Sequence, residues 1–81
     1  MIEVTINGQK EKIVIGTTVT DILDAKDVRP EMVAVELNGQ LVQKNEYISL
    51  ELSAGDKMEF LYYMAGGVKN DGLSYNNQGS Y

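Results

Sequence analysis

The chain has 81 residues, 43% of them hydrophobic, and a net charge of −5 from 12 acidic and 7 basic side chains. This length limits it to one small domain, and the absence of cysteine and histidine excludes disulfides, thiol nucleophiles and the commonest general base and metal ligands. The sequence has no basic patch that would favour nucleic-acid binding. No apolar run approaches the ~20 residues that span a membrane, and the N-terminus lacks the pattern of a signal peptide. We therefore expect a cytoplasmic location.

The N-terminal segment predicts a β-hairpin. Apolar residues alternate with polar ones over residues 2–6, which is the period of a half-buried strand. Asn7-Gly8 follows, and both residue types tolerate the positive φ angles of a tight hairpin turn. Residues 10–15 then form the returning strand, which ends at Gly16.

A single helix is predicted after this hairpin. Thr18 is suited to cap it, and Asp21 lies in the first turn, where a negative charge favours the helix dipole. Three apolar residues recur at the i, i+3, i+4 spacing of one buried helix face: Val19, Ile22 and Leu23. Arg29-Pro30 is expected to stop the helix, because a residue before proline avoids the α region.

A second hairpin is predicted beyond the helix. Residues 33–37 (VAVEL) form a short strand, Asn38-Gly39 forms the turn, and residues 41–42 begin the returning strand. Residues 44–52 are less regular. Their apolar side chains are expected to contribute contacts to the core: Tyr47, Ile48, Leu50 and Leu52.

The last predicted strand spans residues 57–64 and follows a turn at residues 53–56. Alternate residues of this strand face opposite sides of a sheet. One set is expected in the core with apolar residues of the other elements: Met58, Phe60 and Tyr62 with Val4, Ile6, Ile22, Leu23, Val33 and Val35. The other set is expected on the outer sheet face: Glu59, Leu61 and Tyr63.

The order of elements is therefore β-β-α-β-β-β. In so short a chain the two hairpins join most simply through their first and last strands, in one mixed sheet of about five strands with one helix across it. This is an α+β fold of the ubiquitin-like β-grasp type.

Gly66-Gly67 follows the last apolar strand directly, and a polar segment, residues 68–81, continues beyond it. That segment has few apolar residues to bury, which predicts a disordered tail after a folded domain of residues 1–67. The diglycine could be a simple flexible joint. Alternatively, because glycine lacks Cβ, it could let a terminal carboxylate enter the narrow active site of a partner.

Four stretches, in this order, carry a resemblance to a known protein family: INGQ, TTVTDIL, VAVELNGQLV and LSAGDKMEFLYYMAGG. With them the chain resembles the ThiS family of sulfur carrier proteins, to which MoaD is similar in fold. The resemblance covers residues 1–67. It implies that a ThiF-type, E1-like enzyme adenylates the Gly67 carboxylate with ATP, and that the adenylate becomes a thiocarboxylate whose sulfur passes to a biosynthetic enzyme. Gly66 would enter the partner with Gly67. ATP and magnesium would belong to the partner, so the resemblance implies a carrier without catalytic residues, metal or cofactor of its own.

The chain departs from the family pattern because Gly67 is followed by residues 68–81 and has no free carboxylate. A protease could remove this extension, as JAMM-type metalloproteases do for some bacterial carriers of cysteine or homocysteine sulfur supply. The extension could also be foreign to the natural protein, or the chain could be a non-covalent interaction module. A protein modifier conjugated through Gly67 is a further alternative. The recipient of the sulfur, in thiazole, cysteine or homocysteine synthesis, stays open.

An exposed apolar and aromatic patch on the last strand is the expected docking surface for the activating enzyme. Leu61 and Tyr63 would form it, with Glu59 pairing with a basic residue of the partner. The alternative is that these side chains pack against neighbouring strands. The scattered acidic residues likewise fit either a solvated surface or complementarity to a basic partner.

Overall fold

The computed structural model describes residues 1–63 of the chain. The predictions for Gly66, Gly67 and residues 68–81 therefore lie outside the described residues. The elements, in chain order, are β1 (Ile2–Ile6), β2 (Gln9–Ile13), α1 (Val19–Ala25), the 3₁₀ turn η1 (Pro30–Met32), β3 (Val33–Leu37), β4 (Gln40–Leu41), the 3₁₀ turn η2 (Lys44–Glu46) and β5 (Lys57–Tyr62).

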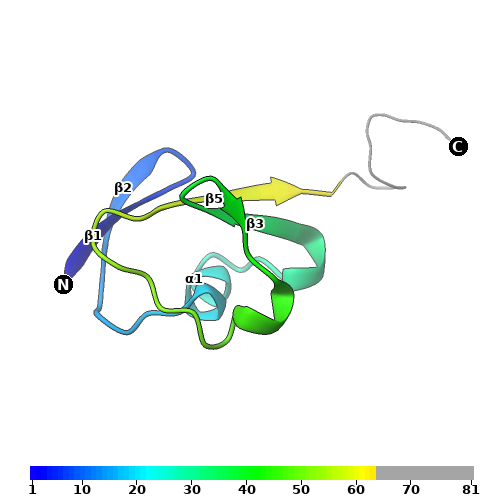
Figure 1. The fold of residues 1–81 in the computed structure, drawn as a ribbon, viewed down its shortest axis with the longest axis horizontal. Coiled ribbons are helices and arrows are strands. Elements are labelled where there is room, and N and C mark those ends of the chain that lie inside the picture. The colour runs from blue at the N-terminus through cyan, green and yellow to red at the C-terminus, as the bar shows by residue number, and fades with distance from the viewer. Residues whose placement is uncertain (64–81) are drawn as a thin grey trace, which may run out of the picture.

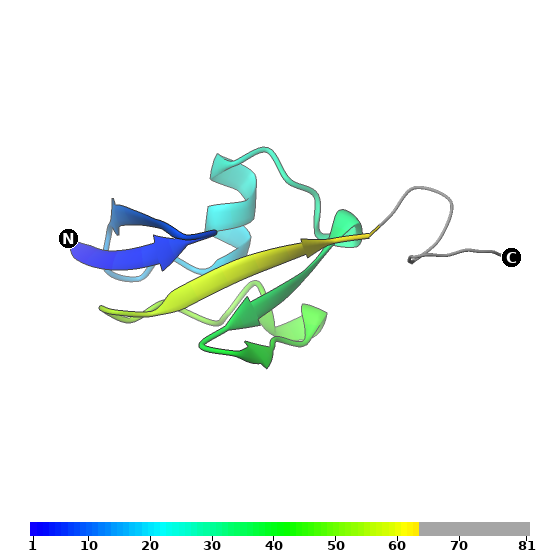
Figure 2. The same cartoon turned by 90° about the horizontal axis from the view of Figure 1, so that it is seen from above.

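The strands form one mixed sheet in the order β2-β1-β5-β3-β4. β1 and β5 run parallel, and the remaining neighbours run antiparallel. In Figure 1 the sheet lies above α1 and the two 3₁₀ turns, and Figure 2 shows β5 between β1 and β3. The predicted β-grasp fold, with its hairpins joined through the first and last strands, is confirmed.

Both asparagine-glycine turns have the predicted positive φ angles. They are 51° and 84° at Asn7 and Gly8, and 53° and 85° at Asn38 and Gly39. Each asparagine also has a second role. Asn7 Oδ1 accepts the Phe60 amide at 2.8 Å, and Asn38 Oδ1 accepts the Lys57 amide at 2.9 Å. The two turns thus bind the central strand from both sides.

The helix begins where the sequence predicts. Thr18 and Asp21 form a capping box, in which each side chain accepts the other residue's backbone N–H. The predicted end at Arg29-Pro30 is wrong, because α1 ends at Ala25 and Pro30 instead begins η1.

The helix ends earlier because Asp27 adopts a left-handed conformation with φ of 60°. Its N–H donates to the Asp24 carbonyl, and the Val28 N–H donates to the Leu23 carbonyl. These two bonds form a Schellman motif, which satisfies the last carbonyls of the helix without any contribution from proline.

The core lies between the sheet and α1. Of the nine residues predicted to form it with the last strand, only Tyr62 lies outside. Eleven residues are buried: Val4, Ile6, Val19, Ile22, Leu23, Val33, Val35, Tyr47, Leu52, Met58 and Phe60. Tyr62 is 58% exposed and contacts Phe60 edge to face, with ring centroids 6.4 Å apart. Ile48 is also exposed, which corrects its predicted core contact.

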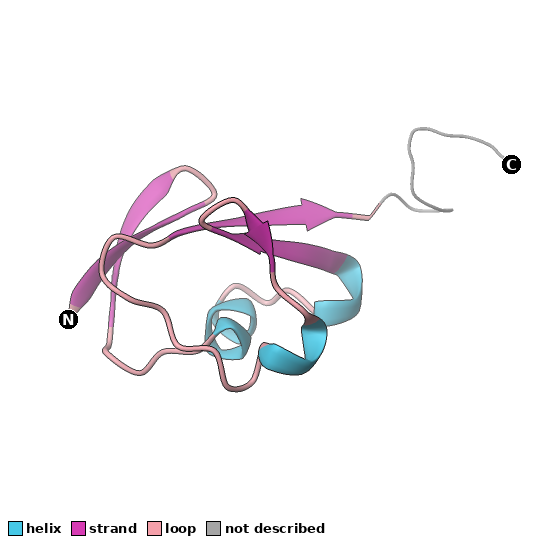
Figure 3. Ribbon diagram, viewed as in Figure 1, coloured by secondary structure: helices cyan, strands magenta, loops and turns pink. Residues whose placement is uncertain are grey.

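Three strands end earlier than predicted, and one of them is β5, which ends at Tyr62. β2 ends at Ile13, and Val14 and Ile15 are exposed, because Ile13 already pairs with Ile2 at the start of β1. β4 has only two residues. Beyond β4 the chain turns into η2 and crosses to α1, as the loops of Figure 3 show.

Candidate functional site

The end of β5 is the part of the fold from which the chain leads on toward the diglycine. β5 is hydrogen-bonded on both sides, to β1 and to β3. The antiparallel pairing with β3 reaches Tyr62, and one more bond follows, from the Tyr63 N–H to the Met32 carbonyl at 3.0 Å. Gly66 and Gly67 come three and four residues later. The central strand therefore fixes the point at which this segment begins.

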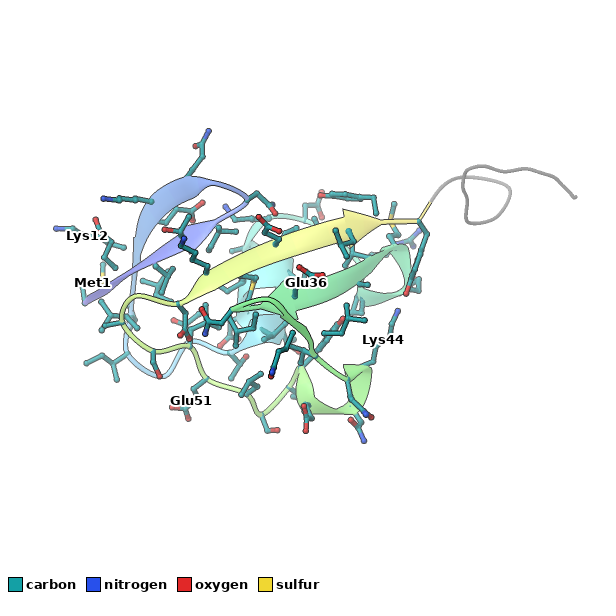
Figure 4. The ribbon with its side chains drawn as sticks, turned by 45° about the horizontal axis from the view of Figure 1, so that its top comes forward. Met1, Lys12, Glu36, Lys44 and Glu51 are labelled. Carbon is teal, nitrogen blue, oxygen red and sulfur yellow. The ribbon has the colours of Figure 1, made fainter. Side chains whose placement is uncertain are left out.

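Two of the three predicted docking residues, Glu59 and Leu61, lie on the sheet face opposite α1, whereas the Tyr63 ring lies 5.2 Å from the Lys44 ammonium of η2. Glu59, Leu61 and Tyr63 are all exposed, and the exposed fractions of Leu61 and Tyr63 are 45% and 47%. The predicted outward position is confirmed for Glu59 and Leu61, while the docking role of all three residues stays a prediction. Figure 4 views this face, with the sheet in front of the helix.

Two further residues complete this surface, and the sequence analysis missed both. Glu36 lies directly opposite Glu59 across the β3–β5 pair, and Leu41 lies opposite Glu36 on β4. The alternation in VAVEL could have identified Glu36, since it falls between residues that face the core. Glu36, Leu41, Glu59 and Leu61 are called the outer-face patch below.

The outer-face patch contains an unfavourable charge arrangement. Like charges directly opposite each other on neighbouring strands destabilise a sheet. The Glu36–Glu59 pair has this geometry, and among the described residues neither glutamate forms a salt bridge. Lys57 lies two residues before Glu59 on β5 and lines the same hollow as both glutamates, so its charge offsets part of the repulsion, and a cation of a partner would relieve it further.

A buried tyrosine lies beneath the end of β5. The Tyr47 hydroxyl accepts the Val35 N–H at 3.2 Å. Burial raises the pKa of Tyr47 above its ordinary value of 10.0, and a negative charge on nearby Tyr63 raises it further, while the Val35 hydrogen bond opposes both effects. Tyr47 is therefore neutral at physiological pH and acts here as a structural acceptor.

Within residues 1–63, no three acidic side chains lie close enough to hold a metal ion. A hollow of about 510 Å³ lies between β2 and α1, and its lining residues include none from β5. No helix in the described part of the chain is long and apolar enough to cross a membrane.

Comparison with known proteins identifies relatives. The model of the ThiS family matches residues 4–67. The crystal structure of a thiamine biosynthesis protein (ThiS) from Geobacter metallireducens is similar, with a TM-score of 0.71 and 35% identity, over 82% of this chain and all of that one. A solution structure of a thiamine biosynthesis protein from the same organism has a TM-score of 0.63 and 28% identity, over 99% of both chains.

Curated relatives are much longer than this chain. Two thiazole synthases, from Paramagnetospirillum magneticum and Magnetococcus marinus, are 32% and 31% identical to it over 65 residues. The match covers 80% of this chain but only 20% of each relative. The family model, by contrast, covers most of the chain, and the β-grasp sheet agrees with the structural relatives. The chain belongs to the ThiS family of sulfur carrier proteins.

Proposed function

We propose that this protein carries sulfur for the thiazole step of thiamine biosynthesis on a freed carboxylate of Gly67. One observation carries the proposal: the central strand β5 leads the chain directly to Gly66-Gly67, and the family match ends at residue 67. The thiamine assignment is supported by the names of the two solved Geobacter structures.

The chemistry needs only the backbone carboxylate from this chain. That carboxylate attacks the α-phosphate of ATP in the active site of a ThiF-type, E1-like enzyme, and pyrophosphate leaves. Sulfide, delivered by a donor system, then attacks the acyl carbon of the adenylate. AMP leaves, and Gly67 ends in a thiocarboxylate. The carrier contributes no catalytic side chain, since the partner supplies ATP, magnesium and the catalytic groups.

The outer-face patch is the surface that docks the activating enzyme. Leu41 and Leu61 supply exposed apolar area on the sheet that leads to the diglycine. The Glu36–Glu59 repulsion is relieved when an arginine or lysine of the partner lies between the two carboxylates. Docking through this surface places the chain end of the same strand in front of the partner's active site.

Thiazole synthase is the acceptor of the sulfur. This is supported by the curated relatives, in which a segment similar to this chain occupies a fifth of a protein named thiazole synthase. A carrier and an acceptor joined in one chain must meet in the reaction. In this protein, we propose that the two meet as separate domains or chains.

Residues 68–81 must be removed before activation, because Gly67 otherwise lies within a peptide bond. A protease of the JAMM type is the proposed processing enzyme. Intact-mass analysis of the protein from its producing cell tests this step. A species that ends at Gly67 supports processing, whereas only the full-length chain counts against it.

The activation step is tested with a chain that ends at Gly67. All eleven core residues lie between Val4 and Phe60, so residues 1–67 retain the complete core. Incubation with a ThiF-type enzyme, ATP and magnesium should give a mass increase that corresponds to acyl-AMP. Adding a sulfide donor should convert the product to a chain with one oxygen replaced by sulfur.

The uncut chain of 81 residues is the matched control, and it should give no adenylate. A chain 1–67 carrying Leu61→Asp should bind the enzyme more weakly, with a raised KM and an unchanged core. If the wild-type chain 1–67 forms no acyl-AMP with its cognate enzyme, the proposed function is wrong.

A further inference from the structure

The end of β5 is held by contacts from two separate turns. Tyr63 is the first residue after the strand, and its N–H donates to the Met32 carbonyl at the end of η1. The Lys44 ammonium, from η2, lies 5.2 Å from the centroid of the Tyr63 ring. This distance is within the range of a cation–π interaction. Figure 4 shows Lys44 reaching toward the end of β5.

The same ammonium also joins the two turns to each other. Lys44 Nζ donates to the Pro30 carbonyl at 2.9 Å. Pro30 begins η1, and Met32, which accepts the Tyr63 N–H, ends it. Lys44, Pro30, Met32 and Tyr63 therefore form a closed set of contacts, which is called the exit clamp below.

The Lys44 ammonium contacts the Pro30 carbonyl and the Tyr63 ring of the exit clamp, and it does not contact a carboxylate among the described residues. Among the described residues it forms no salt bridge, whereas Lys26 pairs with Glu11 at 2.7 Å and Arg29 with Glu31 at 3.7 Å. A free surface lysine loses side-chain entropy when it is held in one place. Its contacts at the end of the last strand offset that cost, and they fix the backbone of Tyr63 from two directions.

The position of Tyr63 determines where the chain end can be delivered. Gly67 lies four residues beyond Tyr63, so the intervening backbone spans at most about 14 Å. Over such a short reach, a change of direction at Tyr63 moves the reacting carboxylate relative to an enzyme docked on the sheet. Small displacements of a reacting group can cost large factors in rate.

We propose that Lys44 is a positioning residue, which through the exit clamp sets the direction in which the chain leaves β5 and so aligns Gly67 for adenylation. This inference rests on the proposed function and adds to it a residue that touches neither ATP nor the reacting carboxylate. It separates two tasks on the same molecule. The outer-face patch binds the enzyme, and the exit clamp aligns the segment that reacts.

The test compares Lys44→Met with Lys44→Arg in chain 1–67, using acyl-AMP formation by the ThiF-type enzyme. Lys44→Met should lower kcat roughly three- to tenfold and leave KM within about twofold, because docking is intact while alignment is lost. Lys44→Arg should restore the rate, since a guanidinium also stacks on aromatic rings. Lys12→Met, which removes the same charge from β2 at the far end of the sheet, should behave as wild type (Figure 4).

A second measurement needs no enzyme and uses the full chain. Lys44→Met should speed hydrogen exchange of the Tyr63 amide roughly three- to tenfold and leave the Lys57 and Phe60 amides unchanged. In a Tyr63→Leu background, adding Lys44→Met should have a smaller effect on this exchange and on kcat than in wild type, because the ring is already absent and only the Lys44–Pro30 hydrogen bond is left to lose.

Three results would overturn the inference. Unchanged kcat in Lys44→Met would show that the clamp does not align the chain end. A raised KM with unchanged kcat would make Lys44 a docking contact. Unchanged exchange at Tyr63 would show that the clamp does not hold the strand end. Failure of wild-type chain 1–67 to form acyl-AMP would refute the proposed function separately, and the exchange measurement would still test the clamp.

Discussion

Replacing Tyr47 with phenylalanine removes one buried oxygen and leaves the ring in place. That oxygen accepts the N–H of Val35, which lies in the middle of β3 and is fully buried. β4 covers only the far end of β3, where it pairs with Glu36 and Leu37. The hydroxyl therefore substitutes for a strand carbonyl at this amide, and its loss leaves a buried donor without an acceptor.

The expected cost follows from that unpaired donor. A buried polar group that loses its partner lowers the free energy of unfolding by about 1–3 kcal/mol. The phenylalanine ring occupies the same space as the tyrosine ring, so packing adds little to this loss. For a domain of this size, a cost of about 2 kcal/mol lowers the melting temperature by roughly 8–16 °C. This would be a large fraction of the stability of so small a fold.

Urea unfolding followed by circular dichroism, with calorimetry alongside, measures the effect. Tyr62→Phe is the matched control, because it removes the same atom from a ring that is 58% exposed, and it should change stability by less than about 0.5 kcal/mol. If Tyr47→Phe were as stable as this control, the hydroxyl would not support β3 and the reasoning would be refuted.

Three further predictions concern the same framework. Because the pKa of Tyr47 is raised in the folded state, its protonated form stabilises the fold below the unfolded pKa of about 10, and this contribution is lost as the pH rises through the higher folded pKa. The stability advantage of wild type over Tyr47→Phe should therefore stay constant up to about pH 9 and shrink as the pH rises above about 10, as measured by urea titrations. Asn7→Gly keeps a positive φ but removes the acceptor of the Phe60 amide, so it should cost about 1–2 kcal/mol in chemical unfolding, and more than Asn7→Asp, which keeps an oxygen there. Asp27→Gly should stabilise the protein by about 0.5–1 kcal/mol, since glycine adopts the left-handed conformation without strain; a lower urea midpoint would contradict this.

Local patterns in the sequence predicted most of the fold. Alternation identified β1, β3 and β5, the asparagine-glycine pairs identified both hairpin turns, and Thr18 identified the start of the helix. These features depend only on residues that are close in the sequence, so they can be recognised in a single sequence. The connection of the two hairpins through β1 and β5 could be predicted because a chain this short has room for only one sheet.

The wrong predictions arose where tertiary geometry decides. Tyr62 has the alternation of a core residue, but α1 has only seven residues and the end of β5 extends past it, so the ring stays 58% exposed. The helix end was assigned to Pro30, although Asp27 accepts a strained conformation earlier. Val14 and Ile15 continue an apolar run, but β1 offers no residue to pair with them.

The candidate site was found in part. The sequence placed Glu59, Leu61 and Tyr63 on the outer face, and their docking role stays a prediction. Glu36 and Leu41 became part of this surface only through the pairing registers of β3 with β5 and β4. Lys44 could not have been found from the sequence, because its partners Pro30 and Tyr63 lie 14 and 19 residues away in an irregular region.

The central position of β5 has a consequence for how the sheet is completed. Among the described elements it is the last strand in chain order, and it lies between the N-terminal hairpin and the β3–β4 hairpin, which do not pair with each other. Isolated two-stranded hairpins are marginal in water, so a chain that lacks β5 should have little stable structure in either hairpin. Completion of the sheet therefore depends on the same strand that precedes Gly66-Gly67 in the chain.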